Sequence, residues 1–315
     1  MRRPAVRVGT RGSALSLRQS GWVAERLAAA LADRSVELIL MSTRGDRHRG
    51  SFEGLSERGL FTSELEEALL RGEIDVAVHS LKDLPVDAHE APPRVSLPLV
   101  AVPRRADPRD AVVSRDGRTL AELPEGARVG TSSPRRAALV RAARPDARVL
   151  AVRGNVDTRV RRLDEGAAVG DDEGSLDALI LAAAGLDRLG MGGRVSERLD
   201  PRAFPPAPGQ GALAVQARDG DPELVAAVVA LDDPEARATT AAERACLAAL
   251  GGGCLLPLGA WARARPGGGL ELDAFVGSAD GAGILRAHAG GRAPEEVGRA
   301  AAEALLAQGA RELLP

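Results

Sequence analysis

The most restrictive feature of the sequence is a short pattern that occurs twice. Arg7–Ser13 reads Arg-Val-Gly-Thr-Arg-Gly-Ser, and Arg128–Ser133 reads Arg-Val-Gly-Thr-Ser-Ser. In both copies the apolar residue before the glycine indicates the end of a strand, and serine is a favourable residue at the start of a helix. A second pair, Asp75–Val78 and Asp177–Ile180, also repeats as an acidic residue followed by an apolar strand. We therefore expect two domains of similar plan, facing each other across a cleft.

Strand-like and helix-like segments alternate along the first hundred residues. The predicted strands are Ala5–Gly9, Val36–Met41 and Asp75–His79, and the predicted helices are Leu15–Ala32 and Thr62–Arg71, with Thr62 as N-cap. This alternation is typical of α/β folds. Thr43–Leu60 reads as a long loop, of a length that is usually either functional or disordered, and Gly170–Ser175 as an acidic surface loop.

The last third of the chain has a different pattern. After a proline-rich crossover come a strand, Leu213–Ala217, and a helix, Pro222–Leu231. Two helices, Pro234–Leu250 and Pro294–Ala307, then enclose two strands, Leu258–Ala264 and Leu270–Val276, joined by a glycine-rich hairpin loop. We expect a small α+β domain here.

Charge and composition exclude several classes of protein. The net charge is −2 and only 2% of residues are aromatic, which argues against a nucleic-acid binder. No apolar run is long enough for a secretory signal or a membrane span, so we expect neither. Two cysteines form no disulfide framework, and a reducing cytoplasm is the expected compartment.

Arginines and hydroxyl residues gather where strands are predicted to end. Ligands of open α/β sheets bind at the carboxyl ends of the strands, and guanidinium groups pair with carboxylates as bidentate forks. No Walker motif, dinucleotide fingerprint or metal-like histidine spacing is present, so we expect a ligand with many carboxylates and no metal. The residues concerned are Arg11, Ser13, Thr131, Ser132, Ser133, Arg135, Arg136, Arg153, Arg159 and Arg188.

Two further segments carry unusual residues. Lys82 is the only lysine beside 41 arginines, and with Asp83 it directly follows a predicted strand. We expect nearby arginines to keep Asp83 ionised, so that it can stabilise a cationic intermediate. Cys254 follows three glycines that leave its sulfur approachable, whereas Cys246 lies within a helix and reads as a small buried residue.

These segments resemble the porphobilinogen deaminase family over nearly the whole chain. The matching stretches, in family order, are Gly9–Ser13, Thr43–Asp46, Gly59–Glu67, Asp75–Pro85, Gly130–Arg136, Arg153–Arg159, Ala183–Leu189, Pro208–Ala212 and Glu243–Pro257. One position departs from the family pattern: Ser63 stands where relatives often have lysine, so a carboxylate contact from that position is not expected.

The resemblance implies an α/β fold with two domains like the lobes of type II periplasmic binding proteins and a smaller C-terminal α+β domain. Residues 1–103 with 206–230 would form domain 1, the discontinuous substrate and catalytic lobe. Residues 104–205 would form domain 2, the carboxylate-binding lobe, and residues 231–315 domain 3, which carries the cofactor.

The implied activity is that of a cytoplasmic, monomeric transferase of tetrapyrrole and haem biosynthesis. It condenses four porphobilinogen molecules head to tail, with loss of ammonia, and releases hydroxymethylbilane by hydrolysis. One dipyrromethane cofactor per chain would be joined to Cys254 by a thioether.

Roles carried over by motif make Asp83 the catalytic carboxylate and Lys82 a contact to substrate or cofactor. Ser80 joins the arginines and hydroxyl residues named above in binding acid side chains, while Gln210 and Phe61 would lie near the site. Two other readings of the residues are a binding protein for a polycarboxylate, without a covalent group, and a Schiff-base enzyme that uses Lys82.

Overall fold

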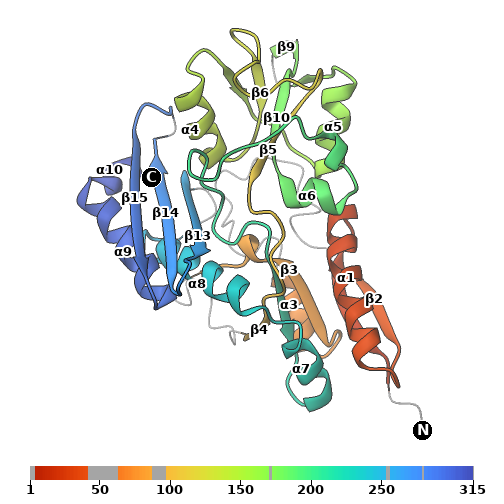
Figure 1. Cartoon of the computed structure of the whole chain (residues 1–315). Helices are drawn as coiled ribbons and strands as arrows, with labels where there is room; N and C mark the ends of the chain where they lie inside the picture. Colours follow the sequence, from red (N-terminus) through yellow and green to blue (C-terminus); the bar gives the residue numbers. More distant parts are fainter. Residues whose placement is uncertain are drawn as a thin grey trace. The chain divides into compact units, whose positions relative to one another are not determined.

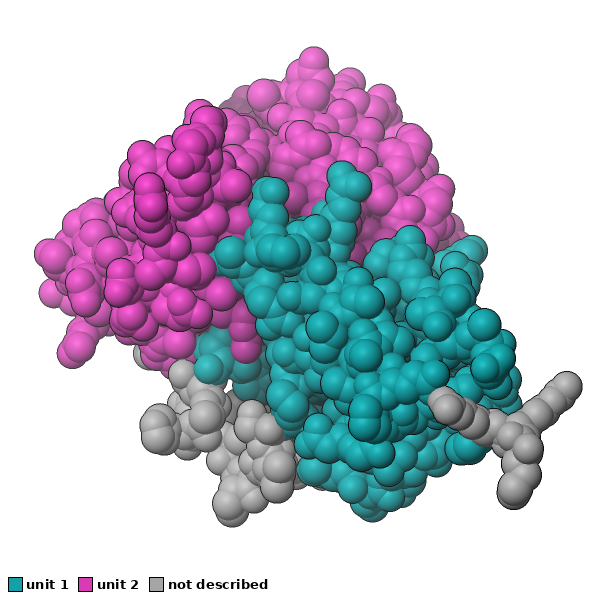
Figure 2. Space-filling view, turned by 60° about the horizontal axis from the view of Figure 1, so that its bottom comes forward, with its two compact units in different colours: residues 1–105, 212–238 teal, residues 106–211, 239–315 magenta. Residues whose placement is uncertain are grey.

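The computed structural model describes residues 4–41, 63–86, 97–169, 172–252, 256–278 and 280–314. They form two compact units, which Figure 2 shows in different colours: unit 1 is Met1–Arg105 with Ala212–Ala238, and unit 2 is Ala106–Gly211 with Thr239–Pro315. The predicted loop Thr43–Leu60 and the predicted N-cap Thr62 lie outside the described residues.

Unit 1 is built on a five-stranded sheet with the order β2-β1-β3-β12-β4 (Figure 1). Its strands are β1 (Val6–Arg11), β2 (Val36–Met41), β3 (Val76–Ser80), β4 (Leu99–Ala101) and β12 (Leu213–Ala217), and its helices are α1 (Ala14–Ala30), α3 (Ser63–Leu70) and α7 (Pro222–Val229). β1 runs parallel to β2 and β3, whereas β12 is antiparallel to β3 and β4. A 3-10 turn, Leu81–Asp83, follows β3 directly.

Unit 2 repeats this plan in a sheet with the order β11-β5-β10-β6-β7. The elements are β5 (Asp110–Ser114), β6 (Arg128–Gly130), α4 (Pro134–Ala143), β7 (Arg148–Leu150), α5 (Val156–Asp164), β10 (Ala178–Ala182), α6 (Ala183–Arg188) and β11 (Glu197–Arg198). β6 is parallel to β7 and β10, while β5 is antiparallel to β10 and β11. Read from its other edge, the sheet has the strand plan of unit 1, so the repetition predicted from the sequence is confirmed.

The repetition extends to individual hydrogen bonds. The backbone N–H of Arg7 donates to Asp75 Oδ2 at 2.9 Å, and that of Arg128 donates to Asp177 Oδ2 at 2.7 Å. The backbone N–H of each aspartate donates back to the carbonyl of the same arginine, at 2.8 and 2.9 Å. Each aspartate thus fixes the register between two parallel strands, which explains why the motif recurs with its acidic residue.

The C-terminal part of unit 2 is an antiparallel three-stranded sheet with helices. It comprises β13 (Leu258–Ala264), β14 (Leu270–Gly277), β15 (Ile284–Gly291), α9 (Pro294–Ala307), α10 (Ala310–Leu313) and α8 (Pro234–Ala249) from Thr239 onward, since the first residues of α8 belong to unit 1. β15 was not predicted, because an edge strand rich in glycine, alanine and charged residues lacks an apolar alternation. The α/β fold class expected from the sequence, two lobes of similar plan followed by a smaller α+β region, is confirmed.

The acidic surface loop predicted at Gly170–Ser175 is wrong in part, because Asp172–Ser175 form β9, which pairs with β8 (Ala168–Val169). A short hairpin forms there because the two segments satisfy each other's backbone groups. No helix among the described residues has the length and apolar composition needed to cross a membrane.

Gly298 allows helix α9 to pack closely against α8. A Cβ placed there would lie 2.2 Å from the carbonyl oxygen of Ala242 and 2.8 Å from the backbone N of Cys246, two backbone atoms that cannot move aside alone. Gly21, within α1, has no atom within 4 Å of the corresponding position. The two helical glycines therefore differ only in what surrounds them.

We predict that Gly298→Ala lowers the free energy of unfolding by roughly 1–3 kcal/mol through overpacking. The control Gly21→Ala should raise it by about 0.5–1 kcal/mol, because alanine favours the helix. Urea denaturation of both variants measures the difference. A stabilised Gly298→Ala variant would contradict the packing described here.

Candidate active site

The catalytic and carboxylate-binding residues predicted in unit 1 lie at the carboxyl ends of its parallel strands. Arg11 ends β1 and Ser80 ends β3, and because these strands are parallel neighbours, both residues are at their carboxyl ends. Ser13 caps α1, its Oγ accepting the backbone N–H of Ser16 at 3.2 Å. Lys82 and Asp83 lie in the 3-10 turn after β3. The structure therefore brings this predicted set to the edge where α/β sheets bind ligands.

Ser80 is held by a residue that the sequence analysis missed. Gln19 is buried on α1, and its Nε2 donates to Ser80 Oγ at 3.0 Å. An amide at a position that helical periodicity turns toward the sheet was the available signal, because a buried amide needs a partner. Gln19 leaves the Ser80 hydroxyl in a defined place at the strand end.

Asp83 is in an environment that favours its neutral form. Burial raises the pKa of this carboxyl, and the positive charges of Lys82 and Arg11 oppose the rise. We expected nearby arginines to keep Asp83 ionised; Arg11 and Lys82 do lower its pKa, but desolvation of the charged form has the larger effect and raises it. A carboxylate that is poorly solvated by water interacts more strongly with a cation placed beside it.

His79 supports the site from within β3. The ring is buried, and its Nε2 lies 3.0 Å from Gln216 Oε1 on β12. Since that amide oxygen only accepts, Nε2 carries the proton. Burial, with a smaller contribution from Arg11, lowers the pKa of His79 to about 4 although the bond to Gln216 opposes it. His79 is therefore neutral at pH 7 and serves as a structural donor.

This environment predicts a pH dependence of stability. Because the folded pKa of about 4 lies below the ordinary 6.5, His79 contributes stability that is complete above pH 6.5 and is lost as the pH falls toward 4. The loss amounts to about 3 kcal/mol. In His79→Gln, the unfolding free energy from urea titrations should fall less steeply over this range than in the wild type. Parallel curves for the two proteins would show that His79 does not titrate on unfolding.

The predicted residues of unit 2 also meet at the carboxyl ends of parallel strands. Thr131, Ser132 and Ser133 follow β6, Arg153 and Arg159 follow β7, and Arg188 ends α6 after β10. Ser133 caps α4, Thr131 Oγ1 accepts the backbone N–H of Ser133 at 3.2 Å, and Ser132 Oγ donates to the carbonyl of Val152 at 2.7 Å. These bonds shape the turn.

Arg135 and Arg136 are buried and share a carboxylate from the chain itself. Asp110 Oδ2 accepts from Arg135 Nη1 at 2.7 Å, and Asp110 Oδ1 accepts from Arg136 Nη2 at 2.8 Å. Burial would raise the pKa of Asp110, but the two guanidinium groups hold it well below its usual range. The cations in the first turn of α4 thus have an internal counter-ion, which the sequence analysis did not identify.

Arg159 and Arg188 are less tightly paired. Arg159 Nε donates to the carbonyl of Gly154 at 2.7 Å, and Arg188 Nη2 donates to that of Gly211 at 2.8 Å. Burial lowers the pKa of both, and for Arg159 the nearby Arg136 lowers it further, to about 10. The positive charge of Arg136 beside Arg159 creates a potential suited to an anionic ligand.

Gln210 is tied to the same cluster. Its Nε2 donates to Asp110 Oδ1 at 2.8 Å, and its Oε1 accepts from Arg136 Nη2 at 3.2 Å. The preceding residue, Gly209, donates its N–H to the buried Glu243 of α8 at 2.7 Å, and Glu243 also accepts the N–H of Ala262 at 2.9 Å. Glu243 thereby connects the turn that carries Gln210 to α8 and β13.

Of the two cysteines, the structure describes Cys246 alone. Cys246 is buried in α8, and burial together with Glu243 raises its pKa to about 12, so it stays an unreactive thiol. After α8, Gly251 adopts φ 97°, a left-handed conformation that turns the chain away from the helix axis. Cys254 and Phe61 lie outside the described residues.

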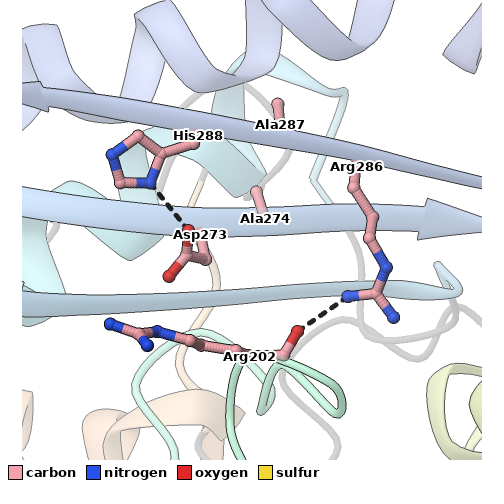
Figure 3. A pocket seen from close by; sticks show the side chains of 6 residues that line it. All are labelled: Arg202, Asp273, Ala274, Arg286, Ala287 and His288. Atoms are coloured by element: carbon pink, nitrogen blue, oxygen red, sulfur yellow. Dashed lines mark hydrogen bonds and ion pairs between the residues drawn. The ribbon is translucent and has the colours of Figure 1, made fainter.

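A hollow of about 250 Å³ lies elsewhere in unit 2, on the C-terminal sheet. Figure 3 shows Asp273 accepting from His288 Nδ1 at 2.7 Å, and Arg286 donating to the carbonyl of Arg202 at 2.8 Å. No residue of the predicted site lines it. These side chains are engaged with one another, and the hollow is separate from the strand ends described above.

The class defined by this architecture is an α/β protein of two lobes. The strand ends of unit 1 carry hydroxyl groups, one arginine and the Lys82–Asp83 pair, and those of unit 2 carry hydroxyl groups and arginines. Residues 6–226 match the family described as "Porphobilinogen deaminase, dipyromethane cofactor binding domain", and residues 237–307 match "Porphobilinogen deaminase, C-terminal domain".

Curated relatives match over nearly the whole chain. The porphobilinogen deaminase of Roseiflexus castenholzii is 46% identical over 99% of both chains, and that of Deinococcus radiodurans is 45% identical over 98% of this chain and 97% of its own. That of Brevibacillus brevis is 43% identical over 98% and 96%. The chain belongs to the porphobilinogen deaminase family. The enzyme class and the dipyrromethane cofactor predicted from the sequence are confirmed.

Proposed function

We propose that this chain condenses four porphobilinogen molecules, with Asp83 as the catalytic carboxylate, and releases hydroxymethylbilane. The observation that carries this assignment is the position of Asp83: it follows β3 at the carboxyl ends of the parallel strands, where burial raises its pKa and the charges of Lys82 and Arg11 lower it. A carboxylate in that position is suited to a substrate that becomes cationic when ammonia leaves.

Asp83 acts on the reacting substrate through its charge. Loss of ammonia from an aminomethyl pyrrole leaves an azafulvenium cation, and a carboxylate at about 4 Å stabilises it by about 4 kcal/mol at an effective dielectric constant of about 20. That corresponds to roughly a thousandfold in rate. Asp83 can also accept the ring proton after coupling. Lys82, a compact ammonium, contacts a carboxylate of the substrate or cofactor.

The cofactor fits the residues that the structure describes. Each pyrrole carries an acetate and a propionate, and the arginines and hydroxyl groups at the strand ends of unit 2 match such carboxylates. The Nε of Arg135 is buried and lacks a hydrogen-bond partner among the described residues, as expected of a donor intended for a ligand. When bound, dipyrromethane supplies the chain end to which the first substrate unit is joined.

In this proposal, acid side chains are bound by Arg11, Ser13 and Ser80 of unit 1, and by Thr131, Ser132, Ser133, Arg135, Arg136, Arg153, Arg159 and Arg188 of unit 2. Gln210 lies near the site, and Phe61 shelters it. The thiolate that carries the cofactor is Cys254, and the inert environment of Cys246 supports that choice. The same proposal includes the three-domain division, a monomeric state, a cytoplasmic location and the absence of nucleic-acid and membrane partners.

We predict that Cys254→Ser gives folded protein without dipyrromethane, whereas Cys246→Ser keeps the cofactor, because a buried thiol with a pKa of about 12 supplies almost no thiolate. Intact-protein mass, together with the colour given by an acidic aldehyde reagent for pyrroles, reads the outcome. A dipyrrole that persists in Cys254→Ser would refute the attachment site.

We predict that Asp83→Asn lowers kcat by two or more orders of magnitude, because the amide keeps the shape and removes the charge. Cofactor loading should survive when preassembled tetrapyrrole is supplied. The control is Asp75→Asn, which removes a buried carboxylate paired with Arg7 at the other end of β3. It should cost stability and leave kcat per folded chain within about threefold. A steady-state assay of porphobilinogen consumption decides, and near-normal turnover in Asp83→Asn would overturn the mechanism.

A further inference from the structure

Asp110 is a fully buried carboxylate in unit 2 that the proposed mechanism does not use. It lies at the carboxyl ends of the parallel strands, beside the residues proposed to bind the ligand. It is the first residue of β5 and pairs with Ala182, the last residue of β10. Because β5 is antiparallel to β10, its beginning lies beside the carboxyl ends of the parallel strands. Asp110 therefore lies directly beneath the turn that starts α4.

Three side chains donate to this one carboxylate. Oδ1 accepts from Arg136 Nε at 3.0 Å, from Arg136 Nη2 at 2.8 Å and from Gln210 Nε2 at 2.8 Å, while Oδ2 accepts from Arg135 Nη1 at 2.7 Å. Two contacts from Arg136 form a fork, which fixes the plane of its guanidinium group as well as its position. Asp110 thus orients both arginines and the glutamine at once.

Backbone carbonyls complete the arrangement and limit what each arginine can still bind. Arg136 Nη1 donates to Ile180 O at 3.1 Å, and Arg135 Nη1 donates to Pro205 O at 2.8 Å. Arg136 therefore uses all three of its nitrogen atoms within the protein, whereas the Nε of Arg135 is buried without a partner among the described residues. The two neighbouring arginines are not equivalent.

Unit 1 shows that the fold itself does not require this carboxylate. The first residue of β12, the strand that corresponds to β5, is Leu213, which pairs with Ser80 at the end of β3. The residues that correspond to Arg135 and Arg136, counted from the capping serine, are Leu15 and Ser16. The acidic residue and the two arginines thus occur together in one lobe and are all absent from equivalent positions of the other.

We infer that Asp110 is a positioning residue for substrate and cofactor binding: it fixes the guanidinium groups of Arg135 and Arg136 and leaves the Nε of Arg135 for a carboxylate of the ligand. It also reduces the charge of the trio to a single positive one, since two guanidinium groups face one carboxylate. This inference rests on the proposed role of the arginines in binding acid side chains. Removing a buried counter-ion leaves two uncompensated cations, so the arginines move rather than stay in place.

The test is Asp110→Asn, an isosteric change that keeps most of the shape and removes the charge. We expect the fraction of purified chains that carry dipyrromethane, read by intact mass, to fall at least fivefold. In the loaded fraction, KM for porphobilinogen should rise at least tenfold while kcat stays within threefold, because Asp110 contacts no reacting atom. Asp110→Glu, which keeps the charge, should recover part of the loading.

Asp107→Asn is the matched control. Asp107 lies three residues earlier, is also paired with two arginines, Arg109 and Arg198, and contacts neither Arg135 nor Arg136 in any bond that the structure shows. Its loading and KM should stay within about twofold of the wild type. Normal loading and KM in Asp110→Asn would overturn the inference, and so would a fall in kcat with an unchanged KM.

If Asp110→Asn alone does not fold, the double variant Asp110→Asn/Arg136→Gln removes one charge of each sign and restores the balance. It should load less cofactor than Arg136→Gln, because Arg135 is no longer held, and equal loading of the two would overturn the inference. Arg135→Gln separates this inference from the proposed function. Normal loading in Arg135→Gln refutes the binding role of the arginine itself, whereas impaired loading there with normal Asp110→Asn refutes only the role of Asp110.

Discussion

A buried arginine pair needs a carboxylate beside it, and in unit 2 much of the local architecture follows from that need. The Asp110 carboxylate lies among groups from β5, α4 and the turn that carries Gln210, and Arg136 extends the connection to the end of β10. Glu243 continues the polar chain from Gly209 to α8 and β13. Each of these groups is buried, so each would be costly if its partner were absent. The start of α4, where we propose that carboxylates bind, is therefore held by a connected network of buried polar groups and not by surface contacts.

Two lobes with one strand plan carry different chemistry because the same backbone positions hold different side chains. At the strand end after β3, unit 1 places Lys82 and Asp83 in a tight turn, while α6 begins at the corresponding place after β10. At the first turn of the helix after the repeated motif, unit 1 has Leu15 and Ser16 where unit 2 has Arg135 and Arg136. The fold supplies strand ends and helix starts, and local substitutions decide whether a lobe carries the carboxylate that we propose as catalytic or a set of guanidinium groups.

Three aspartates show how environment separates their functions. Arg7 and Arg218 keep the pKa of Asp75 at about 2 against the effect of burial, and Asp110 is held even more strongly in its charged form by two arginines. Asp83 has no such fork in the described contacts, and burial dominates, so its pKa is raised. A permanently paired carboxylate serves structure, whereas one that lacks a fixed counter-ion remains able to respond to a cationic intermediate.

The sequence alone determined the repetition of the two lobes, most strand and helix positions, and the family, because these depend on local patterns. A strand end, a Gly-Thr turn and a capping serine can be recognised within seven residues. It also identified the cationic strand ends, since their arginines stand next to those motifs. Only the tertiary structure decided which arginines are neutralised, because Asp110 lies 25 residues before Arg135 and meets it through antiparallel strand pairing. For the same reason we did not predict the hydrogen bond from Gln19 to Ser80, the dominant effect of burial on the pKa of Asp83, or the edge strand β15. Each depends on which residues surround a position in space, and separation along the sequence does not show this.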